Sequence, residues 1–210
     1  MISATDALAR LHEGNRRFVA NQSTAASTSN EAHRAGLVAG QEPFAIVLGC
    51  SDSRVPAELV FDQGFGELFV IRVAGNVVAP SQVGSVEFAA SRFGTRLVVV
   101  MGHSQCGAVA ATLEELLGRA TTQSRNLRAI VNRIRPAVES VLSGRRDDDL
   151  DVLMHDAVRA NVRAAADHLR HGSDLLEELI EKEGLMIVGA EYSLDSGVVT
   201  FFDGIDESQS

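Results

Sequence analysis

The stretch VVVMGHSQCGAV, residues 98–109, passes from a block of apolar residues through a glycine into polar residues and then into a helical pattern. The stretch VLGCSDSRVPAE, residues 47–58, has the same layout. A continuous apolar run that ends in such a turn is typical of a strand buried on both faces of a parallel sheet. The chain has two cysteines, Cys50 and Cys106, and each lies in the polar part that follows one of these runs and its glycine.

The rest of the chain alternates in the same way between apolar runs and helical patterns. Buried strands are predicted at 44–49, 68–73, 96–102 and 185–190, helices at 4–20, 81–94, 106–118, 151–170 and 174–182, and a last strand at 197–204. This order predicts an α/β fold with a mostly parallel central sheet, in which four parallel strands and an antiparallel edge strand are flanked by helices. The polar segment 21–32 is expected to form a loop or arm after an N-terminal helix.

Composition narrows the class of protein. A chain of 210 residues that is 45% hydrophobic suits one domain, here residues 1–210, with a substantial core. The net charge of −9 argues against general nucleic-acid binding. The apolar runs are too short to span a bilayer, and the first residues do not read as a secretory signal. We therefore expect a cytoplasmic protein without a membrane partner, whose cysteines are thiols or metal ligands.

The residues that could bind a metal or take part in catalysis lie at the ends of the predicted strands. Ligands of open α/β sheets bind beyond the carboxyl ends of the strands, where Cys50, His103 and Cys106 fall if their strands are neighbours. Two thiolates and an imidazole are ligands that Zn²⁺ takes, and three protein ligands leave a fourth position for a water whose pKa the metal lowers to roughly 7. The alternative is a pair of structural cysteines, because free cysteine is among the most buried residue types.

Asp52 and Arg54 favour the catalytic interpretation, because they follow Cys50 so closely. A carboxylate and a guanidinium at a buried rim are expected to pair, since burying either alone is costly. The paired Asp52 could accept a proton from a zinc-bound hydroxide and orient it toward a substrate. It could also move onto the zinc as a fourth ligand and displace the water.

Three motifs together resemble the β-class carbonic anhydrases: CSDSRV (50–55), LFVIRVAGNVV (68–78) and GHSQCGAV (102–109). The resemblance extends from about Gln41 to Phe202. It implies Zn²⁺ on Cys50, His103 and Cys106, with Asp52 and Arg54 as a catalytic pair. The implied reaction is the reversible hydration of carbon dioxide to bicarbonate and a proton. It also implies a homodimer or a dimer of dimers, an active cleft at the dimer interface, and residues 1–35 packing on the partner subunit.

Further positions follow from the resemblance one at a time. Gln41 is expected to hydrogen-bond the substrate, and the Gly107 amide to help bind bicarbonate. Phe69, Ala74 and Phe88 are expected to wall an apolar pocket for carbon dioxide. The alternative for the two phenylalanines is packing in the core, which is the usual role of aromatic side chains in strands and helices.

One feature of the family is incomplete in this sequence. Some members regulate themselves with bicarbonate in a second pocket built from a tryptophan, an arginine and a tyrosine. Arg72 and Tyr192 match two of these positions, whereas Val47 stands at the tryptophan position. The regulatory pocket, and with it the choice between water and Asp52 on the resting metal, is therefore left open.

Three other functions are compatible with parts of this sequence. A phosphate or redox enzyme could use Cys50 as its nucleophile, but a phosphate loop of the C-x₅-R type would need arginine at position 56, which is Pro56. The same fold and zinc could act on carbonyl sulfide or carbon disulfide. A non-catalytic module could hold a structural zinc with Asp52 as permanent fourth ligand.

Overall fold

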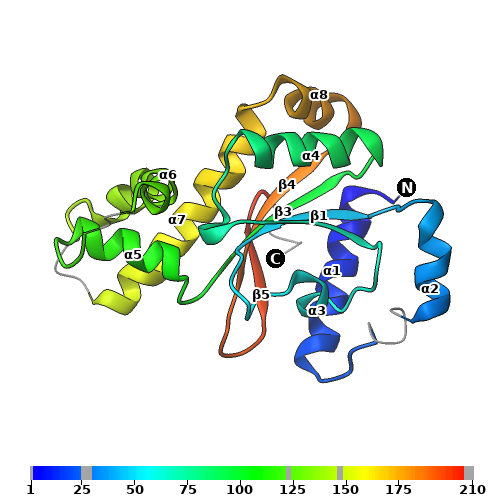
Figure 1. Ribbon diagram of the computed structural model, residues 1–210, viewed down its shortest axis with the longest axis horizontal. Helices are drawn as coiled ribbons and strands as arrows, with labels where there is room; N and C mark the ends of the chain where they lie inside the picture. The colour runs from blue at the N-terminus through cyan, green and yellow to red at the C-terminus, as the bar shows by residue number, and fades with distance from the viewer. Residues whose placement is uncertain (1, 25–29, 122–123, 146–148, 206–210) are drawn as a thin grey trace.

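A single five-stranded sheet forms the centre of the protein (Figure 1). The computed structural model describes residues 2–24, 30–121, 124–145 and 149–205. The strands are β1 (Ala45–Gly49), β2 (Leu68–Arg72), β3 (Leu97–His103), β4 (Met186–Tyr192) and β5 (Val199–Asp203). Their order is β2-β1-β3-β4-β5, with every pair parallel except β4 and β5. The predicted fold class, four parallel strands with an antiparallel edge strand, is confirmed.

The helices account for most of the remaining described chain. They are α1 (Ala4–Val19), α2 (Glu31–Gly36), α3 (Ala57–Val60), α4 (Pro80–Arg92), α5 (Gly107–Leu116), α6 (Arg125–Leu142), α7 (Leu150–His171) and α8 (Asp174–Glu183), with the short 3-10 turns η2 (Leu37–Ala39) and η3 (Ala74–Asn76). None of the helices in the described ranges combines the length and the apolar character that crossing a membrane would require.

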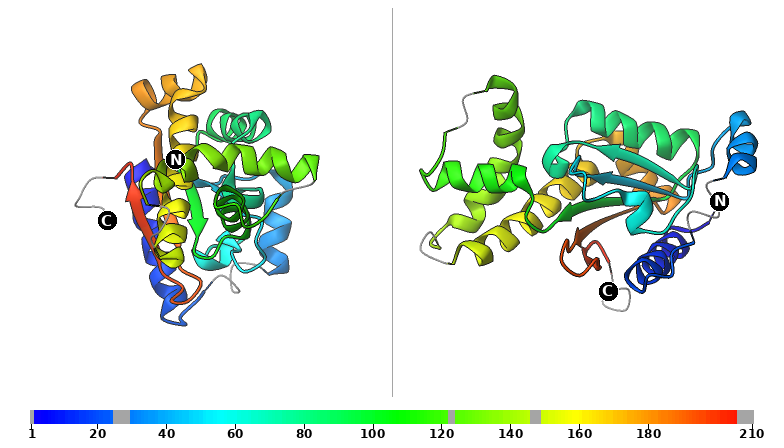
Figure 2. Two further views of the ribbon diagram at one scale, coloured as in Figure 1. Left: turned by 90° about the vertical axis from the view of Figure 1, so that its left-hand side faces the viewer. Right: turned by 60° about the horizontal axis from the view of Figure 1, so that its bottom comes forward.

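Helices cover both faces of the sheet (Figures 1 and 2). Side chains alternate along each strand, so every strand packs against both layers of helices. On β1, Ala45 and Val47 pack with α1 and α3, whereas Ile46 and Leu48 pack with α4, α7 and α8. All four side chains are fully buried. This two-sided burial explains why the predicted strands read as continuous apolar runs rather than as alternating ones.

A third apolar cluster lies beyond the carboxyl ends of β1 and β3. It is formed by α5, α6 and the first half of α7, and it includes Cys50 and Cys106. Helix α6 was not predicted from the sequence; it contains Pro136, which usually ends or bends a helix. Packing of Ile134 and Val138 into this cluster stabilises α6 despite that proline.

The N-terminal helix packs against its own sheet, and its expected contact with a partner subunit stays a prediction. Leu8 and Leu11 of α1 are 2% and 0% exposed, because they join the core beneath their own sheet. Asn15 Nδ2 also donates to the carbonyl of Val60 at 3.1 Å. Helix α2, which begins inside the predicted loop, buries none of its residues, and Val38 in η2 is 88% exposed. Residues 25–29 of the expected arm lie outside the described residues.

Candidate metal centre and catalytic pair

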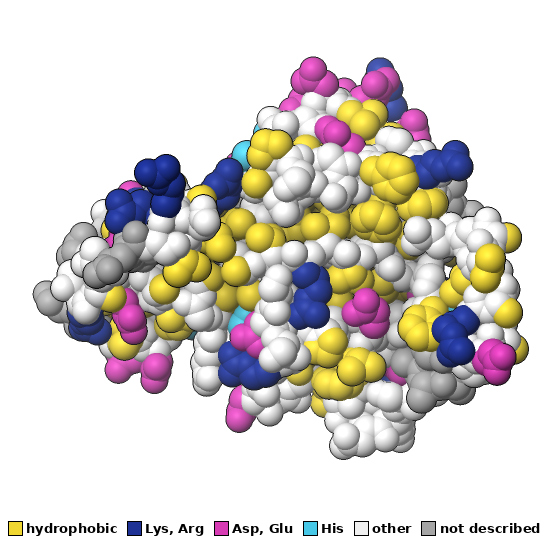
Figure 3. Space-filling model, in the orientation of Figure 1, with side chains coloured by type: hydrophobic (Ala, Val, Ile, Leu, Met, Phe, Trp, Pro, Cys, Tyr) yellow, Lys and Arg dark blue, Asp and Glu magenta, His cyan; other side chains and the backbone are white. Residues whose placement is uncertain are grey.

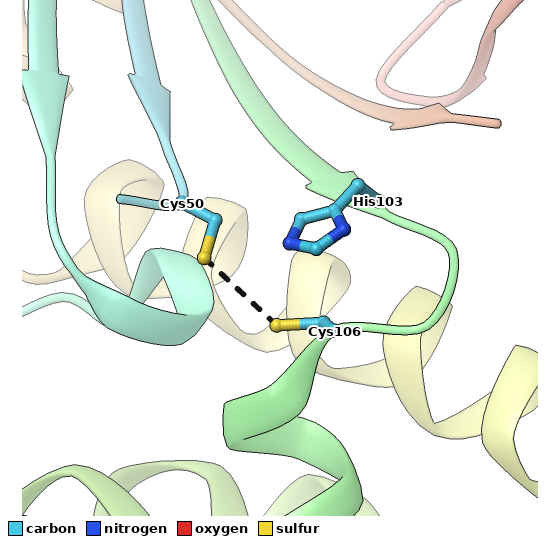
Figure 4. Close-up of side chains that lie close together, drawn as sticks. All are labelled: Cys50, His103 and Cys106. Atoms are coloured by element: carbon cyan, nitrogen blue, oxygen red, sulfur yellow. Dashed lines mark hydrogen bonds between the residues drawn. The ribbon is translucent and has the colours of Figure 1, made fainter. Parts of the chain in front are cut away.

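Parallel pairing of β1 and β3 brings the candidate metal ligands together. Gly49 lies opposite Met101 in the register, so Cys50 and His103 reach the same edge of the sheet. Gln105 takes a positive φ of 56°, which turns the chain tightly enough to return Cys106 toward Cys50. The two sulfurs are 4.0 Å apart, and they lie with a His103 nitrogen in a group whose ligand atoms are all within 4.8 Å of one another (Figure 4).

The His103 ring is oriented by its neighbour. Its Nδ1 lies 2.9 Å from the carbonyl oxygen of Ser104, so Nδ1–H donates there and Nε2 carries the free lone pair. Within the described ranges, the buried Nε2 has no hydrogen-bond partner. The Ser104 N–H in turn donates to the Tyr192 carbonyl at 3.0 Å, which anchors the turn to β4. A buried nitrogen with no partner, facing two sulfurs, is a typical position for a metal ligand.

The dimensions of this group fit a zinc ion. A tetrahedral ion with Zn–S bonds of about 2.3 Å separates two sulfurs by roughly 3.8 Å. The observed separation of 4.0 Å needs little adjustment. Cys50, His103 and Cys106 are all buried, so these soft ligands are shielded from solvent. Three protein ligands would leave the fourth tetrahedral position for water or substrate.

Electrostatics also favour a cation here. The Cys106 thiol donates toward Cys50 and thereby lowers the pKa of Cys50, and the same contact raises the pKa of Cys106. Burial opposes a charged His103, but the adjacent Cys50 and the Ser104 carbonyl outweigh it and raise the pKa of His103. The cluster therefore stabilises a thiolate at Cys50 and positive charge beside it, as a site for a divalent cation would.

Asp52 and Arg54 form the predicted pair at the rim. Arg54 Nε donates to Asp52 Oδ1 at 3.0 Å, its terminal nitrogen donates to Oδ2 at 2.8 Å, and its backbone N–H donates to Oδ1 at 2.9 Å. These hydrogen bonds hold the pKa of Asp52 well below its usual range. Asp52 Oδ2 lies 3.9 Å from His103 Nε2, so the carboxylate stands next to the candidate metal position.

Arg72 braces the segment that carries these residues. Its Nε donates to the Cys50 carbonyl at 3.0 Å, and a terminal nitrogen donates to the Asp52 carbonyl at 2.5 Å. Tyr192 and Val47 are 6% and 0% exposed and belong to the same core cluster beneath the sheet. Burial raises the pKa of the Tyr192 hydroxyl. The guanidinium of Arg72 thus has a structural task in this chain.

Two of the five expected substrate-binding residues lie beside the metal ligands. Ala74 begins η3, and the N–H of the next residue, Gly75, donates to Cys50 Sγ at 3.3 Å. Gly107 directly follows Cys106 at the first turn of α5 and is exposed. A Cβ at Gly107 would meet no atom within 4 Å, and the space over the backbone is therefore free.

The other three expected residues lie at the opposite end of the sheet in the same chain. Gln41 is exposed and precedes β1, whereas Cys50 follows it, and β1 alone spans about 16 Å. Phe69 is the second residue of β2 and lies opposite Ile46, and its ring lies 6.2 Å from the ring of Phe88. Phe88 is 53% exposed. The structure therefore does not bring these residues to their own chain's metal ligands.

Sequence reasoning missed two residues that surround Cys50. One is Gly75, which donates to its sulfur. The other is Asn161 of α7, whose Nδ2 donates to the Gly75 carbonyl at 2.8 Å. A signal for Asn161 was available, because it is a polar residue on the apolar stripe that includes Ala157, Val158 and Val162. A buried amide on such a stripe usually has a specific hydrogen-bond partner.

Comparisons with known proteins agree on one family. The sequence profile described as "Carbonic anhydrase" matches residues 45–199. Carbonic anhydrase 2 of Mycobacterium tuberculosis is 42% identical over 195 residues, which cover 93% of this chain and 91% of that protein. A carbonic anhydrase of Mycolicibacterium smegmatis is 40% identical over 189 residues, covering 90% and 88%.

Solved structures show the same relationship. The β-carbonic anhydrase CafA of Aspergillus fumigatus superimposes with a TM-score of 0.75 at 27% identity and covers 88% of each chain. The β-carbonic anhydrase CcaA has a TM-score of 0.76 at 25% identity, covering 93% of this chain and 95% of that one.

Proposed function

Because the chain belongs to the β-carbonic anhydrase family, we propose that it hydrates carbon dioxide reversibly with a Zn²⁺ ion held by Cys50, His103 and Cys106. The observation that carries the metal assignment is the buried Nε2 of His103, which faces two sulfurs and has no hydrogen-bond partner in the described part of the chain. Family membership supports the reaction itself. The two cysteines fit a reducing compartment, and the cytoplasm is the location that we propose.

The chain's own residues divide the catalytic work around that ion. Zinc held by three protein ligands supplies Lewis acidity and makes a water-derived nucleophile available near neutral pH. Asp52, held by two side-chain hydrogen bonds from Arg54, would accept a hydrogen bond from the nucleophile and so orient it toward the substrate. The Gly107 amide is placed to donate to bicarbonate, and Ala74 offers an apolar wall to carbon dioxide.

Gln41, Phe69 and Phe88 are proposed to complete the site of a second copy of the chain. In their own chain these residues lie at the opposite end of the sheet from the metal ligands, which supports a role at a partner's site. Apolar side chains gather in a band across one face of the molecule (Figure 3). The half-exposed Phe88 also packs on Phe69 and Phe93, so an aromatic surface is available for such a contact. One related structure is described as that of tetrameric β-carbonic anhydrases.

The second bicarbonate pocket of some family members is not proposed for this chain in the same form. Val47 cannot offer the indole of a tryptophan, and Arg72 is engaged with two backbone carbonyls. We infer that Arg72 mainly holds the Cys50–Asp52 segment. Whether water or Asp52 completes the metal coordination is then governed by the Asp52–Arg54 pair.

The experiment that tests the function combines zinc analysis with stopped-flow carbon dioxide hydration on the purified protein. We expect about one zinc per chain and rapid hydration, with little turnover of carbonyl sulfide or carbon disulfide assayed in parallel. A purified protein without bound zinc would support the thiol enzyme instead. Bound zinc without hydration at any pH would support the structural module.

A further inference from the structure

Asn161 is a polar residue among the buried, mostly apolar side chains of α7. It lies on the face of α7 that is buried against the sheet, and its side chain is 3% exposed. Burying an amide without hydrogen bonds is energetically costly. Leucine at this position would match the neighbouring Val158 and Val162, so the amide is expected to perform a task that packing alone does not require.

The hydrogen bonds of Asn161 lead to the candidate metal ligand through one residue. Its Nδ2 donates to the Gly75 carbonyl at 2.8 Å, and the Gly75 N–H donates to Cys50 Sγ at 3.3 Å. Both contacts depend on the conformation of Gly75, which has a φ of 67° and a ψ of 22°. Holding the carbonyl of this glycine therefore also holds its N–H on the sulfur.

The surroundings of Gly75 leave little freedom for another arrangement. A Cβ there would lie 2.7 Å from Ile134 Cδ1 and 3.0 Å from the Ala108 Cβ. Gly102, one residue before the ligand His103, is covered equally closely by Val158 and Val162. Helix α7 thus contacts the end of β3 through Val158 and Val162, and it contacts η3 through Asn161.

We propose that Asn161 is a positioning residue for the metal centre, which acts through Gly75 to keep a backbone N–H on the Cys50 sulfur. This inference rests on the proposed metal site. A hydrogen bond to a ligating thiolate stabilises the deprotonated sulfur and fixes its orientation toward the metal, and it also changes how much charge the sulfur donates. Loss of outer partners of this kind typically weakens metal binding by 10–100-fold.

The first test needs no substitution and uses the protein loaded with ¹¹³Cd in place of zinc. We expect cysteine protons of Cys50 and Cys106 to couple to the cadmium, and the Gly75 amide proton to couple to it as well through the N–H···S hydrogen bond. Cysteine coupling without Gly75 coupling overturns the inference and leaves the metal site intact. Absence of cysteine coupling overturns both the inference and the metal site.

The second test separates positioning from stability with a matched pair of variants, Asn161→Leu and Asn15→Leu. Asn15 is a buried asparagine whose amide contacts the backbone at Val60 and Gly197, on the other face of the sheet. We expect both variants to unfold at lower urea concentration. Only Asn161→Leu should weaken zinc affinity, by about 10-fold or more, and shift the sulfur-to-metal charge-transfer band of the cobalt(II)-loaded protein.

An Asn161→Leu protein with unchanged zinc affinity and an unchanged band overturns the inference. The same holds if Asn15→Leu shifts both quantities equally, because a general loss of stability would then explain the effect. If Asn161→Leu does not fold, the cadmium coupling of the unsubstituted protein decides the question.

Discussion

Each candidate metal ligand depends on a different backbone feature to point inward. Cys50 follows β1 and receives the Gly75 N–H, and His103 ends β3 with its Nδ1 bound to the Ser104 carbonyl. Cys106 is brought back by the positive φ of Gln105 and caps α5. Because the three features come from separate segments, a change at any one of them is expected to affect the metal site.

Substituting Asp52 with asparagine tests the catalytic pair. The change preserves shape but removes the charge and leaves a weaker hydrogen-bond acceptor, so we expect the hydration rate to fall by roughly 100-fold or more. Stability should change by less than about 1 kcal/mol, because Arg54 is more than half exposed and exposed pairs contribute little. Stopped-flow hydration and urea unfolding measure the two effects. Asp195→Asn on the exposed turn after β4 is the control, and an unaltered rate in Asp52→Asn would refute the proposed role.

The pH dependence follows from the lowered pKa of Asp52, which the Arg54 hydrogen bonds cause. A lowered pKa in the folded state means that the carboxylate's stabilising contribution is present above its unfolded pKa of about 3.9 and is lost only as pH falls through the lower folded value. Near neutral pH, Asp52 therefore stays charged. An acidic loss of activity should come from Asp52 leaving Arg54 to bind the metal. Crystal structures of the metal-loaded protein at low and high pH would show whether Asp52 changes its partner. Identical metal coordination at both pH values would contradict the prediction.

Helix α1 is held in place by very close packing on α3. A Cβ at Gly14 would lie 1.8 Å from the Phe61 carbonyl oxygen, so the backbones touch where this glycine stands. Asn15 adds hydrogen bonds to the Gly197 carbonyl at 2.9 Å and from the Val199 N–H at 2.9 Å. The helix therefore connects α3 with the start of β5, and its position within its own chain is strongly determined.

A pair of glycine substitutions tests this packing. Gly14→Ala must push α1 away from Phe61, and we expect it to cost about 2 kcal/mol or more of unfolding free energy. Gly36→Ala in α2 is the matched control, since a Cβ there meets nothing within 4 Å, and it should be neutral or stabilise by up to about 1 kcal/mol. Chemical denaturation of both proteins is the measurement. Equal stability of Gly14→Ala and the unsubstituted protein would show that the contact is not tight.

The distribution of site residues over the two ends of the sheet has a consequence for assembly. Cys50, His103 and Cys106 lie at the carboxyl end of the parallel strands, and Gln41 and Phe69 lie at the amino end of β1 and β2. A complete site of the proposed kind therefore needs two chains. In a two-fold dimer each chain would supply one set of residues to its own site and the other set to its partner's site.

Mixing two inactive variants tests this arrangement. If Gln41 serves the partner's site, a dimer of one Gln41→Ala chain and one Asp52→Asn chain contains one intact site and one doubly altered site. Random exchange of equal amounts should then restore activity to roughly a quarter of all sites. Hydration rates before and after exchange are the measurement, and mass spectrometry of intact dimers verifies that mixed dimers have formed. Mixed dimers without restored activity would place Gln41 in its own chain's site.

Local patterns in the sequence determined the fold class and the residues of the metal group. Apolar runs followed by glycine mark buried strands, and Cys50, His103 and Cys106 stand at their ends, because the carboxyl ends of parallel strands meet at one edge. The spacing of Asp52 and Arg54 allowed their pairing to be predicted, since two residues of separation suffice for a local contact.

Only the tertiary structure decided which distant segments surround that group. Asn161 reaches Gly75 across 86 positions of the chain, and α6 forms despite Pro136 because the third cluster buries its apolar side. The same holds for α1, which packs beneath its own sheet, and for Gln41 and Phe88, which lie far from Cys50. These outcomes depend on burial and close packing between segments far apart in sequence, and local propensity does not contain that information.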